Sequence, residues 1–418
     1  MATSSSLLTT ALTKIADTPV PPVKKIAVAY SGGLDSTLCI VLAREKYGAE
    51  AVPITVDVGQ GEDEIAQSFA KADLLGITPL LIDARAEFAN EWLARAIRAN
   101  GDYNGYPVST AMTRQLIAAK VAQQALELGC NAVMEGSTGR GNDQYRMHNV
   151  FKLFAPQLTI LVPVRDFDLT RQEELALCEH YGVPVTEIIA GGDDKTLWCR
   201  SIASGGIGLE TALPDDIWMW LVPPHRAPDT PTTLTLTFEA GLPVALDGTP
   251  MPLPDLVATL NEIGGANGIG KIDIFEDGIM DLKSREVYEA PAAKIILAVH
   301  RDIESAVLTK QELQFKKLVE QTWASLVYHG EWFHPLRAAL DAFIQETQQV
   351  VRGTWTVQLY KGTIEIVKRE SPASLFRPEI RSIASSGFNQ QLCGPAALIR
   401  GLPFEVLALR QQTLAAEG

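Results

Sequence analysis

Short apolar segments alternate with longer amphipathic segments along the first half of the chain. Five runs of β-favouring residues predict strands, namely Ile26–Tyr30, Val52–Val56, Leu80–Ile82, Ala132–Met134 and Ile160–Val164. Between the third and fourth runs, apolar residues recur at three- and four-residue spacing from Met112 to Leu128, which predicts a helix that ends at Gly129. Strands that alternate with helices predict an α/β fold with a doubly wound parallel sheet.

The pattern changes after about residue 190. Leu234, Leu236 and Phe238 alternate with threonines, and a turn at Asp247-Gly248 follows. A second alternating run later in the chain leads to a turn at Lys361-Gly362. Alternation that is broken by such dipeptides is typical of antiparallel hairpins, so the sequence predicts a second domain of the α+β class.

These changes divide the chain into four segments. Residues 1–23 are rich in Ser, Thr and Pro and are expected to form a flexible N-terminal tail. We assign residues 24–188 to the doubly wound domain and residues 189–370 to the α+β domain. Residues 371–418 have too few apolar positions for a core of their own, and we expect this C-terminal tail to pack on a neighbouring subunit.

Composition narrows the class of protein. The 418 residues are 46% hydrophobic, and neither a run of about 18 uninterrupted apolar residues nor a secretory signal pattern is found, so the sequence predicts a cytoplasmic protein with no membrane partner. A formal net charge of -14 argues against a nucleic-acid partner. The five cysteines show no CxxC spacing, which argues against a zinc site or a disulfide framework.

The first candidate site lies where a predicted strand ends. Ser31-Gly32-Gly33-Leu34-Asp35-Ser36 stands between this strand and an apolar helix, so that backbone N–H groups and the helix dipole can hold a pyrophosphate. Asp35 can cap the helix or position Mg²⁺. The loop has neither the Gly-Lys-Ser/Thr of a Walker loop nor GxGxxG. It resembles the pyrophosphate loop of ATP pyrophosphatases, which implies cleavage of ATP between the α- and β-phosphates. An ordinary Gly-rich turn is the alternative.

A second Gly-rich segment, from Glu135 to Arg146, follows the strand Ala132–Met134. Because the carboxyl ends of parallel strands share one edge of a sheet, both loops are expected to face one crevice. A hydroxyl, an amide, a carboxylate and a guanidinium in this segment suit the binding of an amino acid.

From Lys25 to about Leu375 the chain resembles the argininosuccinate synthase family of the adenine-nucleotide α-hydrolase (HUP-like) superfamily. The resemblance rests on the two loops and on Asp57-Val58-Gly59-Gln60-Gly61-Glu62, Gly270-Lys271-Ile272-Asp273-Ile274, Tyr288-Glu289-Ala290-Pro291 and Trp332-Phe333-His334-Pro335-Leu336-Arg337. It implies an ATP-pyrophosphatase domain followed by a synthetase and multimerisation domain. It also implies an AMP-forming ligase that joins citrulline to aspartate through a citrullyl adenylate, with ATP and Mg²⁺ but no protein cage for the metal, in a homotetramer.

The resemblance also implies roles for individual residues. The expected ATP-binding residues are Ala29, Tyr30, Ser31, Gly32, Gly33, Leu34, Asp35, Ser36, Thr37, Val56, Gly136 and Gly139. The expected aspartate-binding residues are Thr138, Asn142 and Asp143. The acceptor is expected to contact Tyr106, Thr110, Arg114, Asn142, Arg146, Ser201, Glu276 and Tyr288. Asp35, Asp143 and Arg114 are the candidate catalytic residues.

Several positions depart from the family pattern. Ala111, Gly192 and Ala203 stand where the family has polar contacts to citrulline, and Glu135 replaces a histidine. Losing a hydrogen bond to a buried polar ligand group costs about 1–3 kcal/mol. These departures therefore leave the identity of the acceptor substrate open. A divergent argininosuccinate synthase is favoured. The alternatives are a relative that joins aspartate to another ureido, amide or carboxyl compound, an inactive nucleotide-binding regulator, and a tRNA-modifying enzyme, which the acidic charge disfavours.

Overall fold

The computed structural model describes residues 4–183, 194–204 and 207–417. The chain divides into two compact units, residues 1–373 and residues 374–418. Each unit is described by itself.

A parallel five-stranded sheet forms the first part of unit 1. Its strands are β1 (Lys25–Ala29), β2 (Glu50–Asp57), β3 (Leu80–Asp83), β4 (Ala132–Met134) and β5 (Thr159–Leu161), in the order β3-β2-β1-β4-β5. The predicted α/β class and the five strands are confirmed. The fifth strand ends three residues early, because Pro163 begins helix α8 (Pro163–Asp166). The order of the strands reverses between β1 and β4, where ligands of such sheets bind.

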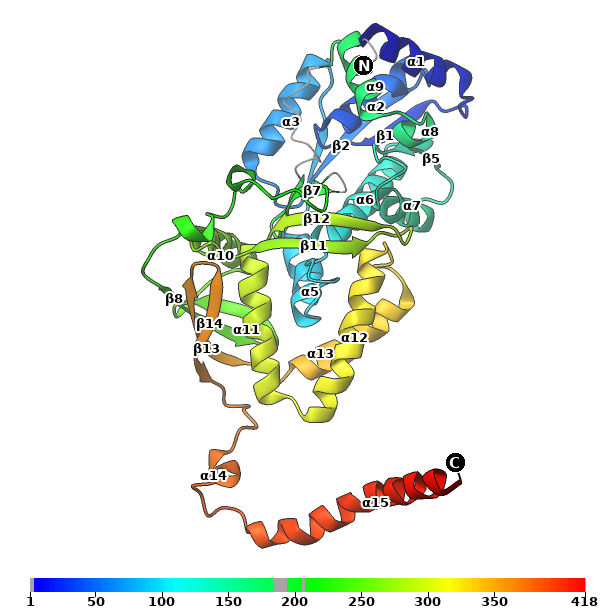
Figure 1. Cartoon of the computed structure of the whole chain (residues 1–418). Helices are drawn as coiled ribbons and strands as arrows, with labels where there is room; N and C mark the ends of the chain where they lie inside the picture. The colour runs from blue at the N-terminus through cyan, green and yellow to red at the C-terminus, as the bar shows by residue number, and fades with distance from the viewer. Residues whose placement is uncertain (1–3, 184–193, 205–206, 418) are drawn as a thin grey trace. The chain divides into compact units, whose positions relative to one another are not determined.

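Helices connect these strands (Figure 1). They are α2 (Leu34–Glu45), α3 (Glu62–Leu74), α4 (Arg85–Glu87), a π-helical turn (Phe88–Leu93), α5 (Ala94–Arg98), α6 (Ser109–Glu127), α7 (Asp143–Phe154) and α9 (Arg171–His180). Helix α6 confirms the helix predicted from Met112 onward. Gly129 follows it with φ +68°, which a residue without a side chain adopts readily.

The N-terminal segment differs from the expected flexible tail. Residues Ser4–Asp17 form helix α1, which packs against α9. Ala11 and Ile15 are buried in a cluster with residues of α2 and α9, and Lys14 Nζ lies 2.9 Å from Glu173 Oε2. The expectation was therefore wrong over this helix, because the sequence pattern did not show that α9 offers its apolar positions a partner.

The second part of unit 1 contains two antiparallel sheets. One has the order β10-β9-β8-β13-β14, from β8 (Thr232–Glu239), β9 (Leu242–Leu246), β10 (Thr249–Pro250), β13 (Gly353–Tyr360) and β14 (Thr363–Glu370). The other has the order β11-β12-β7-β6, from β6 (Asp194–Lys195), β7 (Arg200–Ser204), β11 (Lys271–Asp277) and β12 (Lys283–Glu289). Four helices accompany them: α10 (Leu253–Ala266), α11 (Pro291–Val307), α12 (Lys310–Tyr328) and α13 (Pro335–Gln348). Both predicted turns have two residues of positive φ, at Asp247-Gly248 and at Lys361-Gly362.

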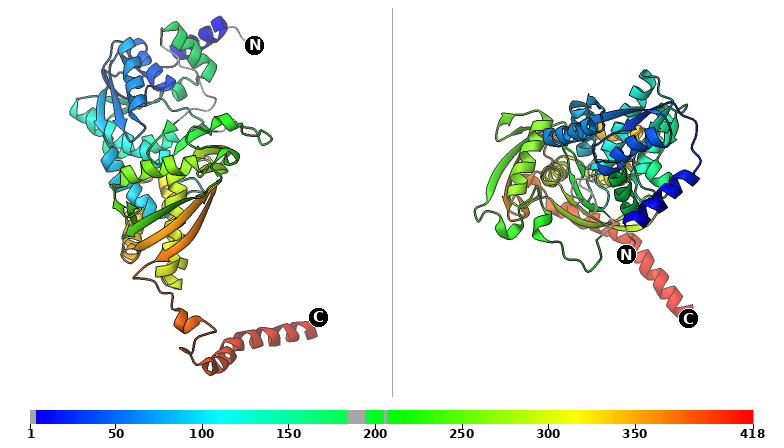
Figure 2. Two further views of the ribbon diagram at one scale, coloured as in Figure 1. Left: turned by 90° about the vertical axis from the view of Figure 1, so that its left-hand side faces the viewer. Right: turned by 90° about the horizontal axis from the view of Figure 1, so that it is seen from above.

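Within unit 1 the β6-β7-β12-β11 sheet lies between the parallel sheet and the larger antiparallel sheet (Figures 1 and 2). One cluster of buried apolar side chains includes residues of all three sheets, from Ala27 on β1 to Leu359 on β13. A shared core of this kind holds the two halves of the unit together.

Unit 2 consists of α14 (Pro378–Arg381), a 3₁₀ turn (Gln390–Leu392) and α15 (Cys393–Glu417). Large apolar side chains on α15 are exposed, among them Leu398, Phe404 and Leu414. By length and composition alone, residues Gln390–Ala416 could cross a membrane, although a single such helix is weak evidence. This segment contains no uninterrupted apolar run of such length, because Arg400, Glu405 and Arg410 interrupt it.

Candidate functional site

The first Gly-rich loop joins β1 to α2 as a compact turn. The Oγ atoms of Ser31 and Ser36 lie 3.1 Å apart, and the Gly33 N–H donates to Ser31 Oγ at 3.3 Å. Gly32 has φ +77°, and a Cβ at this position would lie 2.4 Å from Ser68 Cβ. The turn therefore needs a glycine at 32 both for its backbone conformation and for the approach of α3.

The second Gly-rich segment touches the first. A Cβ on Gly136, two residues after the end of β4, would lie 3.0 Å from the Asp35 carbonyl carbon. This close approach brings residues 135–137 against the first turn of α2. The expectation that both loops share one crevice is met by this contact.

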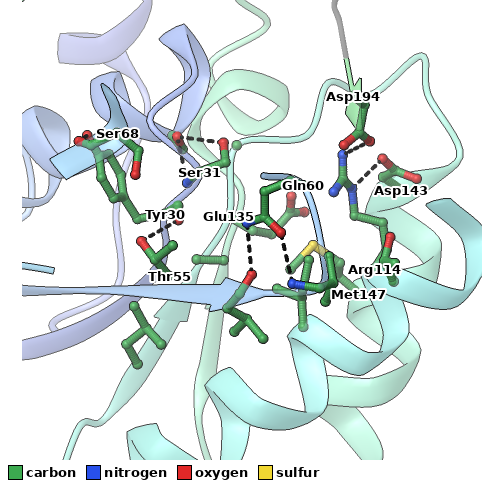
Figure 3. A pocket seen from close by; sticks show the side chains of 18 of the residues that line it. Tyr30, Ser31, Thr55, Gln60, Ser68, Arg114, Glu135, Asp143, Met147 and Asp194 are labelled. Carbon is green, nitrogen blue, oxygen red and sulfur yellow. Dashed lines mark hydrogen bonds and ion pairs between the residues drawn. The ribbon is translucent and has the colours of Figure 1, made fainter. Parts of the chain in front are cut away.

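A cavity of about 240 Å³ lies at this crevice (Figure 3). Nine of the expected binding residues line it: Ala29, Tyr30, Ser31, Asp35, Ser36, Val56, Arg114, Gly136 and Asp143. Gln60, Ser68 and Asp194 line it as well, and their contribution was not anticipated. Apolar side chains at the ends of β1 and β2 and polar groups at the two loops suit a nucleotide, with a base at one end and phosphates at the other.

A network of charges forms one wall of the cavity. Arg114 Nε donates to Asp143 Oδ2 at 2.8 Å, and Arg146 donates to Asp143 Oδ1 at 2.8 Å. A second nitrogen of Arg114 pairs with Asp194. Burial alone would raise the pKa of Asp143, but the charges of Arg114 and Arg146 outweigh it and hold this pKa below its usual value. Asp143 is therefore ionised and accepts hydrogen bonds from two guanidinium groups.

A second polar cluster lies next to this network and is built around Glu276. Tyr288 donates to Glu276 Oε1 at 2.8 Å, and Tyr328 donates to Glu276 Oε2 at 2.7 Å. The ring of Tyr106 stacks on that of Tyr288 with centroids 4.4 Å apart. Burial raises the pKa of Glu276, and the two tyrosine hydroxyls oppose the shift. This cluster offers aromatic faces and an oriented carboxyl group.

Asn142 and Arg146 connect the two clusters. Asn142 Nδ2 donates to the Tyr328 hydroxyl at 3.0 Å, and Arg146 Nε donates to the Tyr328 carbonyl at 2.9 Å. Thr110 lies at the start of α6, where its backbone N–H donates to the Tyr106 hydroxyl at 2.7 Å. Ser201 pairs with Tyr288 in the register of β7 and β12. The expected acceptor residues are thus drawn together from both halves of unit 1.

Other expected residues stand behind the cavity or beside it. Gly32, Gly33, Leu34 and Thr37 shape the turn without lining the cavity, and Gly139 approaches Arg165. Thr138 Oγ1 accepts from the Arg140 N–H at 3.4 Å, within its own loop. Ala111 is buried under Tyr106. Gly192 lies outside the described residues.

In addition to Gln60 and Ser68, sequence reasoning missed three residues that hold polar groups of the site in place. Tyr328 comes from α12, more than 180 residues after Asn142, and no local motif marks it. Arg171 on α9 pairs with Asp35 and donates to Glu174 at 2.9 Å. Burial, together with the neighbouring Asp35, raises the pKa of Glu174 above its usual value, and Arg171 opposes the shift. Asp194, the third, follows a segment that the structure does not describe.

Within residues 4–183, 194–204 and 207–417, no three His, Cys, Asp or Glu side chains are grouped so as to hold a metal ion.

Family comparisons agree with these features. The Arginosuccinate synthase N-terminal HUP domain matches residues 25–184, and the Arginosuccinate synthase C-terminal domain matches residues 192–406. The chain belongs to the argininosuccinate synthase family. The family match reaches well beyond Leu375, where the resemblance was expected to end, and includes part of α15.

Curated members of the argininosuccinate synthase family are similar over most of the chain. The argininosuccinate synthase of Methanopyrus kandleri is 43% identical over 393 residues, which cover 93% of this chain and 99% of that protein. The argininosuccinate synthase of Pyrobaculum aerophilum is 46% identical over 369 residues, which cover 87% and 93%. Among solved structures, the U34-tRNA thiolase NcsA from Methanococcus maripaludis matches 44% of this chain and 67% of its own at 16% identity, with a TM-score of 0.31, too low to support an inference.

Proposed function

We propose that this chain is an ATP-dependent ligase that condenses citrulline with aspartate and forms argininosuccinate, AMP and pyrophosphate. The observation that carries the proposal is the convergence, at one edge of the parallel sheet, of the pyrophosphate loop, the Asp143 network and the Glu276 cluster. Membership of the argininosuccinate synthase family, with relatives of that name at 41–46% identity, supports it.

The reaction has two displacements. In the first, the ureido oxygen of citrulline attacks the α-phosphorus of ATP, the bond to the bridging oxygen breaks, and pyrophosphate leaves. In the second, the aspartate amine attacks the ureido carbon, the bond to the AMP oxygen breaks, and the amine loses a proton. The protein contributes mainly by positioning the reactants and stabilising charge.

Each polar group of the site has a role in this scheme. The Ser31 and Ser36 hydroxyls and the N-terminus of α2 bind the pyrophosphate that leaves. Asp143 receives the ammonium of aspartate, and Asn142 and Thr138 complete that subsite. Arg114 and Arg146 hold carboxylates of the amino-acid substrates in bidentate fashion. Glu276, oriented by two tyrosines, accepts from the α-ammonium of citrulline.

Mg²⁺ belongs to the proposal as the cation that accompanies ATP. Its ligands would be phosphate oxygens, and its positive charge would favour departure of pyrophosphate. Asp35 lines the cavity near the loop and forms an ion pair with Arg171. This ion pair suits a role for Asp35 in orienting the loop.

The departures at the acceptor site do not favour another substrate. Ala111 is buried, and its backbone N–H donates to the Tyr106 hydroxyl at 3.4 Å, so this position supports Tyr106. The stacked Tyr106 and Tyr288 and the oriented Glu276 keep the acceptor pocket polar.

We also propose a homotetramer in the cytoplasm, without a nucleic-acid or membrane partner. The exposed apolar side chains of α15 support association with other copies, because a long apolar face is unfavourable in water. Light scattering of the full chain tests the assembly.

An omission experiment tests the function. Pyrophosphate release is measured with MgATP, aspartate and citrulline, with each amino acid omitted in turn, and the mass of the product is recorded. We expect argininosuccinate only when all three are present. AMP formation with another ureido or amide compound, and none with citrulline, would refute the proposal.

A further inference from the structure

Glu135 is a buried acid with one oxygen that has no partner. It follows β4 directly, and its side chain lines the nucleotide cavity while only 2% of the residue is exposed. The Ser137 N–H donates to Oε2 at 2.7 Å. Oε1 is buried and has no hydrogen-bond partner. Leaving a buried polar atom unpaired is unfavourable, so Oε1 is available to a ligand.

The charged groups around Glu135 come from three helices. They are Asp143 on α7 and Arg165 on α8, while on α2 the buried thiol of Cys39 lies within reach of the charges of both Glu135 and Asp35. Arg165 is already bonded to Asp166 at 2.9 Å, and Arg114, across the cavity, is bonded to Asp143. Arg165 favours the charged form of Glu135 and Asp143 disfavours it, and each has less influence than burial. Lys195 on β6 lines the same cavity.

Burial is the largest influence on Glu135, and it disfavours the charged form. It raises the pKa of this carboxyl to about 7, although the Ser137 N–H opposes the shift. At neutral pH the empty site therefore contains both protonated and ionised Glu135.

The nucleotide would shift this balance further. Gly136, the next residue, packs against the first turn of α2, where the pyrophosphate loop begins the helix. Bound polyphosphate would stand close to Glu135 and would repel a carboxylate there, whereas a protonated carboxyl can donate to a phosphate oxygen.

We propose that Glu135 binds ATP as a neutral carboxylic acid that donates a hydrogen bond from its unpartnered oxygen to a phosphate oxygen. Nucleotide binding is then coupled to the uptake of a proton by Glu135. This inference rests on the proposed use of ATP, but not on the identity of the acceptor.

Calorimetric binding of the ATP analogue with a methylene bridge between the α- and β-phosphorus, as its Mg²⁺ complex, tests the proposal. Titrations in two buffers of different ionisation enthalpy count the protons taken up. Glu135→Gln is the matched control, because its amide has the shape of the protonated acid, donates in the same direction and does not titrate.

We expect wild type to take up about 0.9 proton more than Glu135→Gln at about pH 8. Between about pH 6 and about pH 8, the apparent Kd of wild type should rise about tenfold more than that of Glu135→Gln. The reason is that the fraction of wild-type protein with protonated Glu135, the form that binds the nucleotide, falls over this range. At about pH 6 the two proteins should bind alike. Glu135→Ala should bind about tenfold more weakly there.

Equal proton uptake by wild type and Glu135→Gln would overturn the proposal. So would proton release by wild type, which would mean that the carboxylate binds a cation. If the Gln variant does not fold, wild-type uptake is compared with the protonation of the free nucleotide, and no excess overturns the proposal. Proton-coupled binding without argininosuccinate formation would reject the proposed ligase reaction and leave this inference standing.

Discussion

Replacing Gly32 by Ala should disrupt the pyrophosphate loop by two separable effects. A left-handed backbone costs an L-residue roughly 1–2 kcal/mol, and Gly32 has φ +77°. The new methyl group would lie 2.4 Å from Ser68 Cβ and 2.6 Å from Ser68 Cα, and overpacking of this kind costs about 1–3 kcal/mol. The two costs add to about 2–5 kcal/mol. In the same loop, Lys71 Nζ donates to the Gly32 carbonyl at 2.9 Å.

Gly32→Ala should therefore raise the Kd for MgATP about thirtyfold or more, or lower the free energy of unfolding by about 2–5 kcal/mol. Calorimetry measures the first and urea unfolding the second. Gly33→Ala is the control in the same loop, because Gly33 has φ -70° and its nearest contact would be the Ser31 hydroxyl at 3.3 Å. ATP affinity and stability within twofold of wild type for Gly32→Ala would refute this reasoning.

Three further predictions concern other parts of the chain. Glu276→Gln should raise the KM for citrulline about tenfold or more and leave the KM for ATP unchanged, because it removes a charged acceptor; an ATP effect of equal size in steady-state assays would contradict this. The pKa of Asp143 is lower in the folded protein than its unfolded value of about 3.9. This difference stabilises the folded protein above that unfolded value, and the stabilisation is lost as the pH falls through the lower folded pKa. Asp143→Asn should reduce this loss of stability at acid pH, measured as the urea midpoint from about pH 3 to about pH 7. An unchanged pH dependence would count against the ion pairs. Ile15→Ala should lower the free energy of unfolding by about 2–4 kcal/mol, since Ile15 is buried against α9, while exposed Thr13→Ala should change it by less than about 0.5 kcal/mol; equal urea midpoints would mean that α1 does not dock.

Much of the fold could be predicted locally. The five parallel strands, helix α6 and both positive-φ turns follow from side-chain periodicity and from dipeptides whose conformations are restricted. Helix α1 could not be predicted, because Ala11 and Ile15 are buried by α2 and by α9, and α9 begins more than 150 residues later in the chain. Apolar residues at helical spacing do not reveal which surface will cover them.

The sequence by itself determined the chemistry of the site. Ser31 to Ser36 and Glu135 to Arg146 carry their conformational and hydrogen-bonding requirements in consecutive residues, so local order alone places donors, glycines and carboxylates at the ends of strands.

Only the tertiary structure decided how these groups are paired and charged. Tyr328 orients Glu276 and contacts Asn142, Arg171 holds Asp35, and Glu135 is left with one unpaired oxygen. Protonation depends on burial and on neighbours in space, and these arise from contacts between residues far apart in the chain.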